Sequence, residues 1–302
     1  MDKIFFTGGT GFIGTHVVHK LIEDYRCEIY VLTRKANVDG ISSEYIHFIH
    51  GDISDSLFLT ECIEKIKPTV LFHFAWSVQE SGYAVATSNM EWVIWSEKLA
   101  EIFLRNGGRT IIAAGTCFEY QLVQKAPLSI HSACIPETLY GRCKLAVFKK
   151  FQKLCNDYAA RLVWGRIFYP YGEGEGKRKL ITSALLTIIQ RKKFVCNAPN
   201  NYLDYIHVND IADIFGRLYI ETSISGAVNI GSGDGIYIGT ILKLIEKNTS
   251  MHGYIVCKNT DKEEFWVVSD RDLLEKLHYC CKENLSDNIN KMYLYLLERN
   301  KK

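Results

Sequence analysis

The first fourteen residues constrain the fold of this chain more than any other stretch. An apolar run over residues 4–6 leads into a turn with glycines at Gly8, Gly11 and Gly14, and apolar residues at helical spacing follow over 17–22. The first N–H groups of a helix and the helix dipole attract an anion, and glycines let that anion approach the backbone. The same glycine spacing also occurs in turns that bind nothing. The order of strand, turn and helix nevertheless favours a dinucleotide-binding unit. Its expected cofactor-binding residues are Gly8, Thr10, Gly11, Phe12, Ile13 and Gly14.

Composition excludes several other classes of protein. The 302 residues are 47% hydrophobic and 23% charged, with a formal net charge of +2, so nothing favours binding to nucleic acid or to an anionic membrane. No apolar run approaches the ~18 residues of a membrane span, and the early first strand leaves no room for a signal peptide. The ten cysteines include no CxxC pair and lie in apolar segments. We therefore expect a cytoplasmic protein with reduced thiols and no metal site.

Apolar runs and helical patterns alternate along the chain. Strands are expected at 28–32, 45–50, 69–76 and 109–115, with helices over 55–67 and 89–105 between them. This alternation predicts an α/β fold with a Rossmann-type doubly wound parallel sheet. His73 lies inside the run 69–76, where a hydrogen-bonded core histidine is a better interpretation than a metal ligand.

Two further strands are expected at 161–167 and 226–231. We therefore assign residues 1–169 plus 207–231 to an NAD(P)-binding Rossmann domain. Residues 170–206 and 232–302 are expected to form a smaller C-terminal α/β domain that binds the substrate, with helices over 180–191 and 286–298. The helix over 89–105 is apolar beyond a single stripe, which favours a subunit interface and a homodimer.

The second expected strand ends at Thr33, Arg34 and Lys35. In a dinucleotide-binding fold this strand end meets the adenosine ribose, where an acid favours NAD and an arginine accommodates the 2′-phosphate of NADP. The acid is missing here and two bases follow one another. A solvated loop charge is the alternative, but the pattern predicts NADPH, with NADP preferred over NAD.

A catalytic group is predicted after the fifth strand. Thr116 lies at the carboxyl end of that strand, and Tyr140 and Lys144 follow on a helix, four residues apart and therefore on one face. A free phenol has a pKa near ~10. A lysine ammonium one turn away, together with the positive nicotinamide, should lower it and make Tyr140 an acid/base for a carbonyl or alcohol oxygen. Thr116 can hydrogen-bond to the same oxygen.

With these motifs the chain resembles the extended short-chain dehydrogenases/reductases, the family of nucleotide-sugar epimerases, dehydratases and reductases. The resemblance extends over essentially the whole length, from Thr7 to residues 229–233. It implies that Tyr140 is the acid/base, that Lys144 bonds to the nicotinamide ribose, and that Asp52 and Ile53 lie beside adenine. Further implied cofactor-binding residues are Phe74, Ala75, Trp76, Asn89 and Phe168. Implied substrate-binding residues are Ser77, Cys117, Phe118, Glu119, Tyr169, Arg178 and Asp204.

Departures from the family pattern narrow the expected activity. The 4,6-dehydratases carry an Asp-Glu pair where this chain has Cys117 and Phe118, so the groups for water elimination are absent. An arginine that commonly binds the diphosphate is missing next to Asp204, and Arg178 is expected to take its place. The string over 115–120 is similar to that of 4-ketoreductases such as CDP-abequose and CDP-paratose synthases.

These features predict an NADPH-dependent 4-ketoreductase. Its expected substrate is a nucleotide-diphosphate sugar, a 4-keto-6-deoxy or 3,6-dideoxy hexose of deoxysugar and surface polysaccharide biosynthesis. A 4-epimerase with tightly bound NAD would use the same three residues. A cofactor-sensing or RNA-binding protein on the same fold would not need them.

Overall fold

The computed structural model describes residues 2–36, 38, 43–78, 82–123, 125–258 and 265–299. The chain divides into two compact units. The first unit consists of Met1–Gln121, Ile130–Ile167 and Ala212–Ile230, and the second of Leu122–Ser129, Phe168–Ile211 and Gly231–Lys302. Among the described residues, none of the helices is long and apolar enough to cross a membrane.

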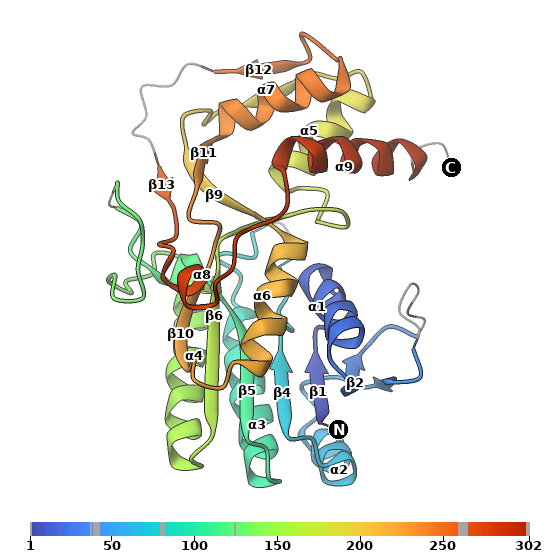
Figure 1. The fold of residues 1–302 in the computed structure, drawn as a ribbon, viewed down its shortest axis with the longest axis vertical. Coiled ribbons are helices and arrows are strands. Elements are labelled where there is room, and N and C mark those ends of the chain that lie inside the picture. Colours follow the sequence, from blue (N-terminus) through green and yellow to red (C-terminus); the bar gives the residue numbers. More distant parts are fainter. Residues whose placement is uncertain are drawn as a thin grey trace. The chain divides into compact units, whose positions relative to one another are not determined.

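A seven-stranded sheet forms the centre of the first unit (Figure 1). Its strands are ordered β10-β6-β5-β4-β1-β2-β3, and every neighbouring pair is parallel. This order reverses direction between β1 and β4, as in doubly wound dinucleotide-binding folds, so the predicted fold class is confirmed. The strands are β1 (Lys3–Thr7), β2 (Glu28–Thr33), β3 (Ile46–His50), β4 (Val70–His73), β5 (Thr110–Thr116), β6 (Arg161–Ile167) and β10 (Gly226–Ile230).

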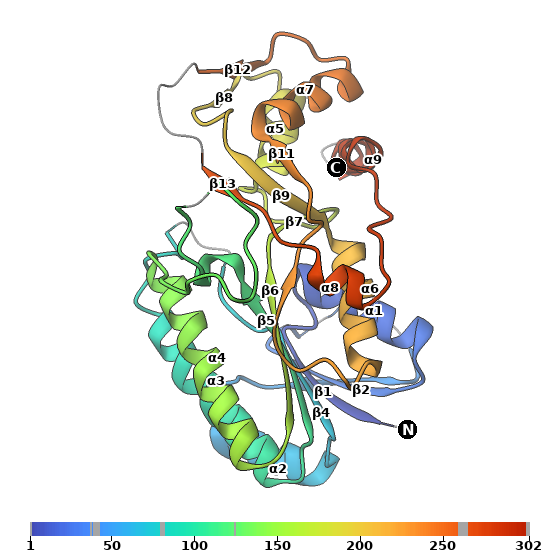
Figure 2. The same cartoon turned by 60° about the vertical axis from the view of Figure 1, so that its left-hand side comes forward.

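Helices cover both faces of this sheet (Figure 2). On one face lie α2 (Ser56–Ile66), α3 (Asn89–Arg105) and α4 (Leu139–Asp157), and on the other lie α1 (Phe12–Asp24) and α6 (Val208–Ile220). A sheet covered on both faces buries both sets of side chains, which explains the nearly continuous apolar strands.

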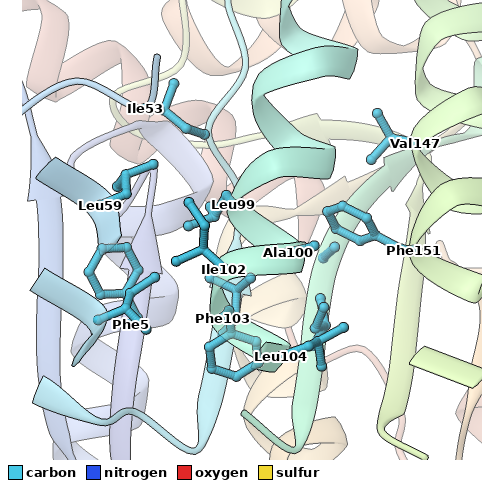
Figure 3. Packing of buried hydrophobic residues seen from close by; sticks show 14 of the residues in the cluster. Phe5, Ile53, Leu59, Leu99, Ala100, Ile102, Phe103, Leu104, Val147 and Phe151 are labelled. Atoms are coloured by element: carbon cyan, nitrogen blue, oxygen red, sulfur yellow. The ribbon is translucent and has the colours of Figure 1, made fainter. Parts of the chain in front are cut away.

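The hydrophobic core lies between the sheet and the α2, α3 and α4 layer (Figure 3). Phe5 of β1, Leu59 of α2, Phe103 of α3 and Phe151 of α4 are fully buried in one cluster. Burial of a side chain of this size contributes about 1.5–3 kcal/mol. The expected apolar helix α3 has the predicted bounds, and its inward residues make up much of this cluster.

Local sequence explains where the elements end. The Asp55 side chain accepts a hydrogen bond from the Phe58 amide and caps α2, and Lys67 takes the left-handed conformation just before Pro68. Strand β4 is shorter than the expected 69–76. It stops at His73, and the next residues pass close to the glycine turn, where a Cβ at Gly8 would collide with backbone atoms of Phe74 and Ala75.

The second unit is built from small sheets and helices. Strand β9 pairs with β11, β13 and β7, and β8 pairs with β12. The expected helices over 180–191 and 286–298 are observed as α5 and α9, with ends shifted by one or two residues. The strands are β7 (Tyr169–Tyr171), β8 (Phe194–Cys196), β9 (Tyr202–His207), β11 (Gly235–Tyr237), β12 (Ile255–Cys257) and β13 (Trp266–Val267). The helices are α5 (Leu180–Ile189), α7 (Ile238–Thr249), α8 (Asp272–Lys276) and α9 (Leu285–Arg299).

Candidate active site

The glycine turn joins β1 to α1 and has the geometry of an anion-binding turn. Gly8 has a φ of +78°, which side chains rarely adopt, and its carbonyl accepts a hydrogen bond of 3.0 Å from the Gly11 amide. A Cβ at Gly14 would collide with the Gly8 carbonyl. Gly11 is the N-cap of α1 and provides no side-chain cap. The first amides of α1 are therefore left for a bound anion, which fits the diphosphate of a dinucleotide.

The end of β2 gathers basic side chains beside this turn. The Lys35 ammonium donates to the Thr10 carbonyl at 3.0 Å, and the Thr33 hydroxyl accepts from the Lys35 amide at 3.1 Å. The Arg34 guanidinium lies 3.6 Å from the Asp52 carboxylate, and its side chain is 73% exposed. An exposed pair of this kind holds Arg34 only weakly, so the guanidinium can turn to another anion.

Three candidate cofactor residues serve the core in this structure. Ile53 belongs to the hydrophobic cluster under α2, and Phe168 is almost fully buried. The Phe74 ring packs edge-on against Phe215 of α6, with ring centroids 4.6 Å apart. The structure shows these side chains packed in the interior, and their expected contacts with the cofactor stay a prediction.

Thr116, Tyr140 and Lys144 come together as predicted. Thr116 ends β5, and the Thr138 hydroxyl caps α4 by accepting a hydrogen bond from the Gly141 amide, which starts the helix just before Tyr140. The Thr116 and Tyr140 hydroxyls share a hydrogen bond. Lys144 lies one turn further along α4 and is only 3% exposed. The three side chains thus form one group within the first unit.

The Lys144 ammonium contacts a backbone carbonyl and two indole rings, the more distant of which is Trp164 at 5.8 Å from Nζ to the ring centroid. Its Nζ donates to the Ala114 carbonyl of β5 at 2.9 Å and lies 4.1 Å from the ring centroid of Trp76. Burial lowers the pKa of Lys144 to about 7, whereas the carboxylate of Glu119 acts in the raising direction.

Burial dominates the electrostatics of Tyr140. Burial raises the pKa of Tyr140, with Tyr83 acting in the same direction, and the hydrogen bond from Thr116 acts against them. Without cofactor, burial therefore sets the net direction of the Tyr140 pKa. The lowering expected from Lys144 together with the bound nicotinamide stays a prediction. Lys144 and Tyr140 share one buried environment that penalises both charged forms.

Glu119 lies in a one-turn helix, η1 (Cys117–Glu119), and has a structural role in place of the expected substrate contact. Its carboxylate accepts hydrogen bonds from the Thr116 amide at 2.9 Å, from the Trp164 indole at 2.9 Å and from the Arg166 guanidinium at 2.9 Å. It is fully buried. Glu119 therefore fixes the backbone of Thr116.

Other candidates around the triad divide into buried and accessible side chains. Cys117 is buried, whereas Phe118 and Ser77 are half-buried, and their expected contacts with the substrate stay a prediction. Asn89 is buried and accepts a hydrogen bond of 2.8 Å from the Trp76 indole. Its amide donates to the carbonyls of Tyr83 and Ala86, so Asn89 links Trp76 to the segment before α3.

Comparison with known proteins agrees with this geometry. The model of the NAD dependent epimerase/dehydratase family matches residues 4–231. The chain belongs to this family. Within the family, the predicted resemblance to extended short-chain dehydrogenases/reductases is confirmed, and the chain is an oxidoreductase-type enzyme.

The chain shares low sequence identity with individual members of the family. A UDP-glucose 4-epimerase from Halalkalibacterium halodurans is 26% identical over 268 residues, covering 82% of this chain and 80% of that protein. A dTDP-4-dehydro-6-deoxyglucose reductase from Escherichia coli is 23% identical over 256 residues, covering 81% of each. The crystal structure of UDP-glucose 4-epimerase from Thermotoga maritima with UDP-glucose has a TM-score of 0.87 at 20% identity, covering 99% of each chain.

The substrate candidates of the second unit have mixed roles in this family member. Asp204 is fully buried and accepts hydrogen bonds from the amides of Ser232, Gly233 and Ser269 at 2.8–3.1 Å, so it holds a loop and is not exposed to a substrate. Tyr169 is half-buried with its ring against Tyr205, at 5.7 Å between centroids. Arg178 is exposed.

His73 is confirmed as a core histidine. Its Nδ1 shares a hydrogen bond of 2.8 Å with the Thr7 hydroxyl and its Nε2 one of 2.9 Å with the Ser96 hydroxyl. Burial lowers its pKa to about 3, with Lys144 acting in the same direction. Among the described residues no group of three potential metal ligands is found.

Tyr83 is a neighbour of Tyr140 that no sequence motif indicates. Its ring stands edge-on to that of Tyr140 with centroids 5.2 Å apart. The Tyr140 amide donates to the carbonyl of the next residue, Ala84, at 2.9 Å. Tyr83 has no fixed spacing from the triad, so only the tertiary contact identifies it.

Proposed function

We propose that the enzyme is an NADPH-dependent 4-ketoreductase that acts on a nucleotide-linked 4-keto-6-deoxy or 3,6-dideoxy hexose. The preference for NADPH over NADH rests on the residues at the end of β2. Thr33, Arg34 and Lys35 provide a hydroxyl and two cations there, where the strand end of an NAD-binding fold commonly carries an acid for the 2′-hydroxyl. A bidentate guanidinium suits a 2′-phosphate.

The cofactor would lie with its diphosphate on the amides that begin α1 and its ribose phosphate at Arg34. When bound, NADPH supplies the hydride for carbon 4 of the sugar. The glycine turn fits this group because its glycines keep the approach to the helix open.

Tyr140 delivers the proton in this proposal. The sugar oxygen gains negative charge as carbon 4 is reduced, and the phenol of Tyr140 transfers its proton to that oxygen. Thr116, already hydrogen-bonded to Tyr140, donates to the same oxygen and orients it. The Lys144 ammonium one turn away stabilises the phenolate that remains.

A 4-epimerase is the second candidate, because curated relatives with 4-epimerase names include the Halalkalibacterium halodurans protein. It would use the same three residues, but in both directions, with Tyr140 first accepting and then returning the proton. The Escherichia coli reductase covers as much of this chain and supports the first candidate. The β2 end favours the reductase.

Following NADPH absorbance with CDP-, dTDP-, GDP- and UDP-linked 4-keto-deoxysugars tests the proposal. We expect stoichiometric NADPH oxidation with at least one of them. Protein that is isolated with one equivalent of NAD, interconverts 4-epimers and oxidises no NADPH would establish the epimerase.

Two further assignments belong to this proposal. Tyr169 and Arg178 of the second unit are the remaining candidates for binding the nucleotide sugar. Helix α3 exposes two apolar side chains, Met90 at 58% and Ile94 at 64%. Their exposure supports a homodimer that pairs through α3. Light scattering of wild type and Ile94→Glu tests the dimer.

A further inference from the structure

The aromatic ring of Trp76 lies against both members of the Tyr140–Lys144 pair. The Lys144 ammonium lies 4.1 Å from its centroid, and its plane stands edge-on to Tyr140 at 73° with centroids 6.1 Å apart. A cation within about 6 Å of a ring is attracted by the negative face of the π system.

Trp76 is itself held in a defined orientation. Its Nε1 donates to the side-chain oxygen of Asn89 at 2.8 Å, and Trp92 of α3 stacks on it with centroids 5.8 Å apart and planes 28° apart. Because the polar edge of the indole is bound to Asn89, the ring offers Lys144 only its π face.

The Lys144 ammonium needs such a partner because it is buried and few neighbouring groups stabilise its positive charge. The Ala114 carbonyl accepts one of its three N–H groups, and the ring centroid of Trp164 lies 5.8 Å away, further than that of Trp76. The titratable groups facing it are Glu119 from η1, His73 from β4 and Tyr140 from its own helix. Of these only Glu119 carries a negative charge, and its carboxylate is already bound to Arg166.

We propose that Trp76 is a positioning residue that holds Lys144 in its ammonium form against the Tyr140 helix. The catalytic consequence rests on the function proposed above, in which a charged Lys144 stabilises the phenolate. The effect on Lys144 itself does not depend on which sugar reaction the enzyme performs.

The charge state of Lys144 can be measured without cofactor or substrate. In lysine-¹⁵Nζ-labelled protein, the Lys144 resonance is assigned by its loss in Lys144→Met and titrated by NMR. We expect its pKa to fall by about one pH unit in Trp76→Leu and by less in Trp76→Phe, which retains a smaller π face. Trp95→Leu is the matched control, because it removes an indole from the same aromatic cluster, where Trp95 contacts Trp92. In this control the Lys144 pKa should stay at the wild-type value.

Activity provides a second readout. As the pH rises, kcat should be lost when Lys144 deprotonates. This loss should begin at the highest pH in wild type, at a lower pH in Trp76→Phe and at the lowest pH in Trp76→Leu. An equal Lys144 pKa in all three proteins would overturn the proposal. If Trp76→Leu does not fold, wild type and Trp76→Phe still give the comparison. Absence of any ketoreductase activity with the NMR shift intact would overturn the proposed function and leave the role of Trp76 standing.

Discussion

Glu119 and Arg166 form a buried ion pair beside Thr116. The Arg166 Nε lies 2.9 Å from the Glu119 Oε2, and the two side chains are 3% and 0% exposed. The other carboxylate oxygen of Glu119 accepts a hydrogen bond from the Thr116 amide. The buried ion pair thus fixes the backbone of Thr116, whose hydroxyl is the proposed hydrogen-bond donor to the substrate.

Breaking this pair should destabilise the protein strongly. Glu119→Gln leaves the Arg166 charge buried without a counter-charge, so the free energy of unfolding should fall by about 3–5 kcal/mol. Denaturant unfolding measures it. The control is Lys153→Ala, which breaks the exposed pair with Asp157 and should leave the stability unchanged. A Glu119→Gln protein as stable as this control would contradict the structural role.

Replacing the phenol should abolish turnover without loss of the fold. In Tyr140→Phe the proton donor is gone, and kcat should fall by about 10²–10⁴-fold. Cofactor affinity, measured by fluorescence titration, should change little, because the ring and its edge-on contacts with Trp76 and Tyr83 remain. Turnover at the wild-type rate would exclude Tyr140 as the acid/base.

The cofactor preference should depend on Arg34. In Arg34→Asp the attraction for the 2′-phosphate becomes repulsion, so KM for NADPH should rise by about 10–100-fold and NADH should become the better cofactor. Lys192→Asp makes the same change of charge on an exposed segment of the second unit and should leave the preference as it was. If Arg34→Asp retains the wild-type preference, the 2′-phosphate is recognised elsewhere.

His73 should make stability fall in acid. Its folded pKa of about 3 is below its ordinary value of 6.5, so its contribution is complete above pH 6.5 and is lost as the pH falls toward 3. Glu175 acts in the opposite sense, because burial raises its pKa to about 7 and its contribution is lost as the pH rises. The comparison of wild type with His73→Gln removes the Glu175 effect.

The two proteins should therefore converge in acid. The difference in their unfolding free energies should shrink by about 1.4 kcal/mol for each pH unit below 6.5. Urea unfolding between pH 8 and pH 5 measures it. A difference independent of pH would mean that His73 is protonated as easily in the folded as in the unfolded chain.

Much of the nucleotide-binding half could be predicted because its signals are local. The glycines at Gly8 and Gly14, the cap at Asp55 and the helical spacing of Tyr140 and Lys144 each act over a few residues. Apolar periodicity likewise locates the strands and the long helix α3.

Side-chain roles that depend on distant partners were predicted less well. Glu119 and Asp204 are polar residues beside expected sites, and the sequence favoured substrate contacts for both. In the fold, each carboxylate is buried and bound by groups that lie far away along the chain, such as Arg166 for Glu119 and Ser269 for Asp204. The sequence does not show whether a carboxylate will be exposed to water or buried and hydrogen-bonded by a distant donor.

The sequence by itself determined the parallel α/β sheet, the glycine turn and the helix that carries Tyr140 and Lys144, because periodicity, glycine conformation and helical spacing are properties of short segments. Only the tertiary structure decided the charge states of Tyr140 and Lys144 and the partners of Glu119 and Trp76. Burial and contacts between remote segments set these quantities. The pKa of Tyr140 illustrates the difference, since one-turn spacing to Lys144 predicts a lowered value and burial of both groups raises it.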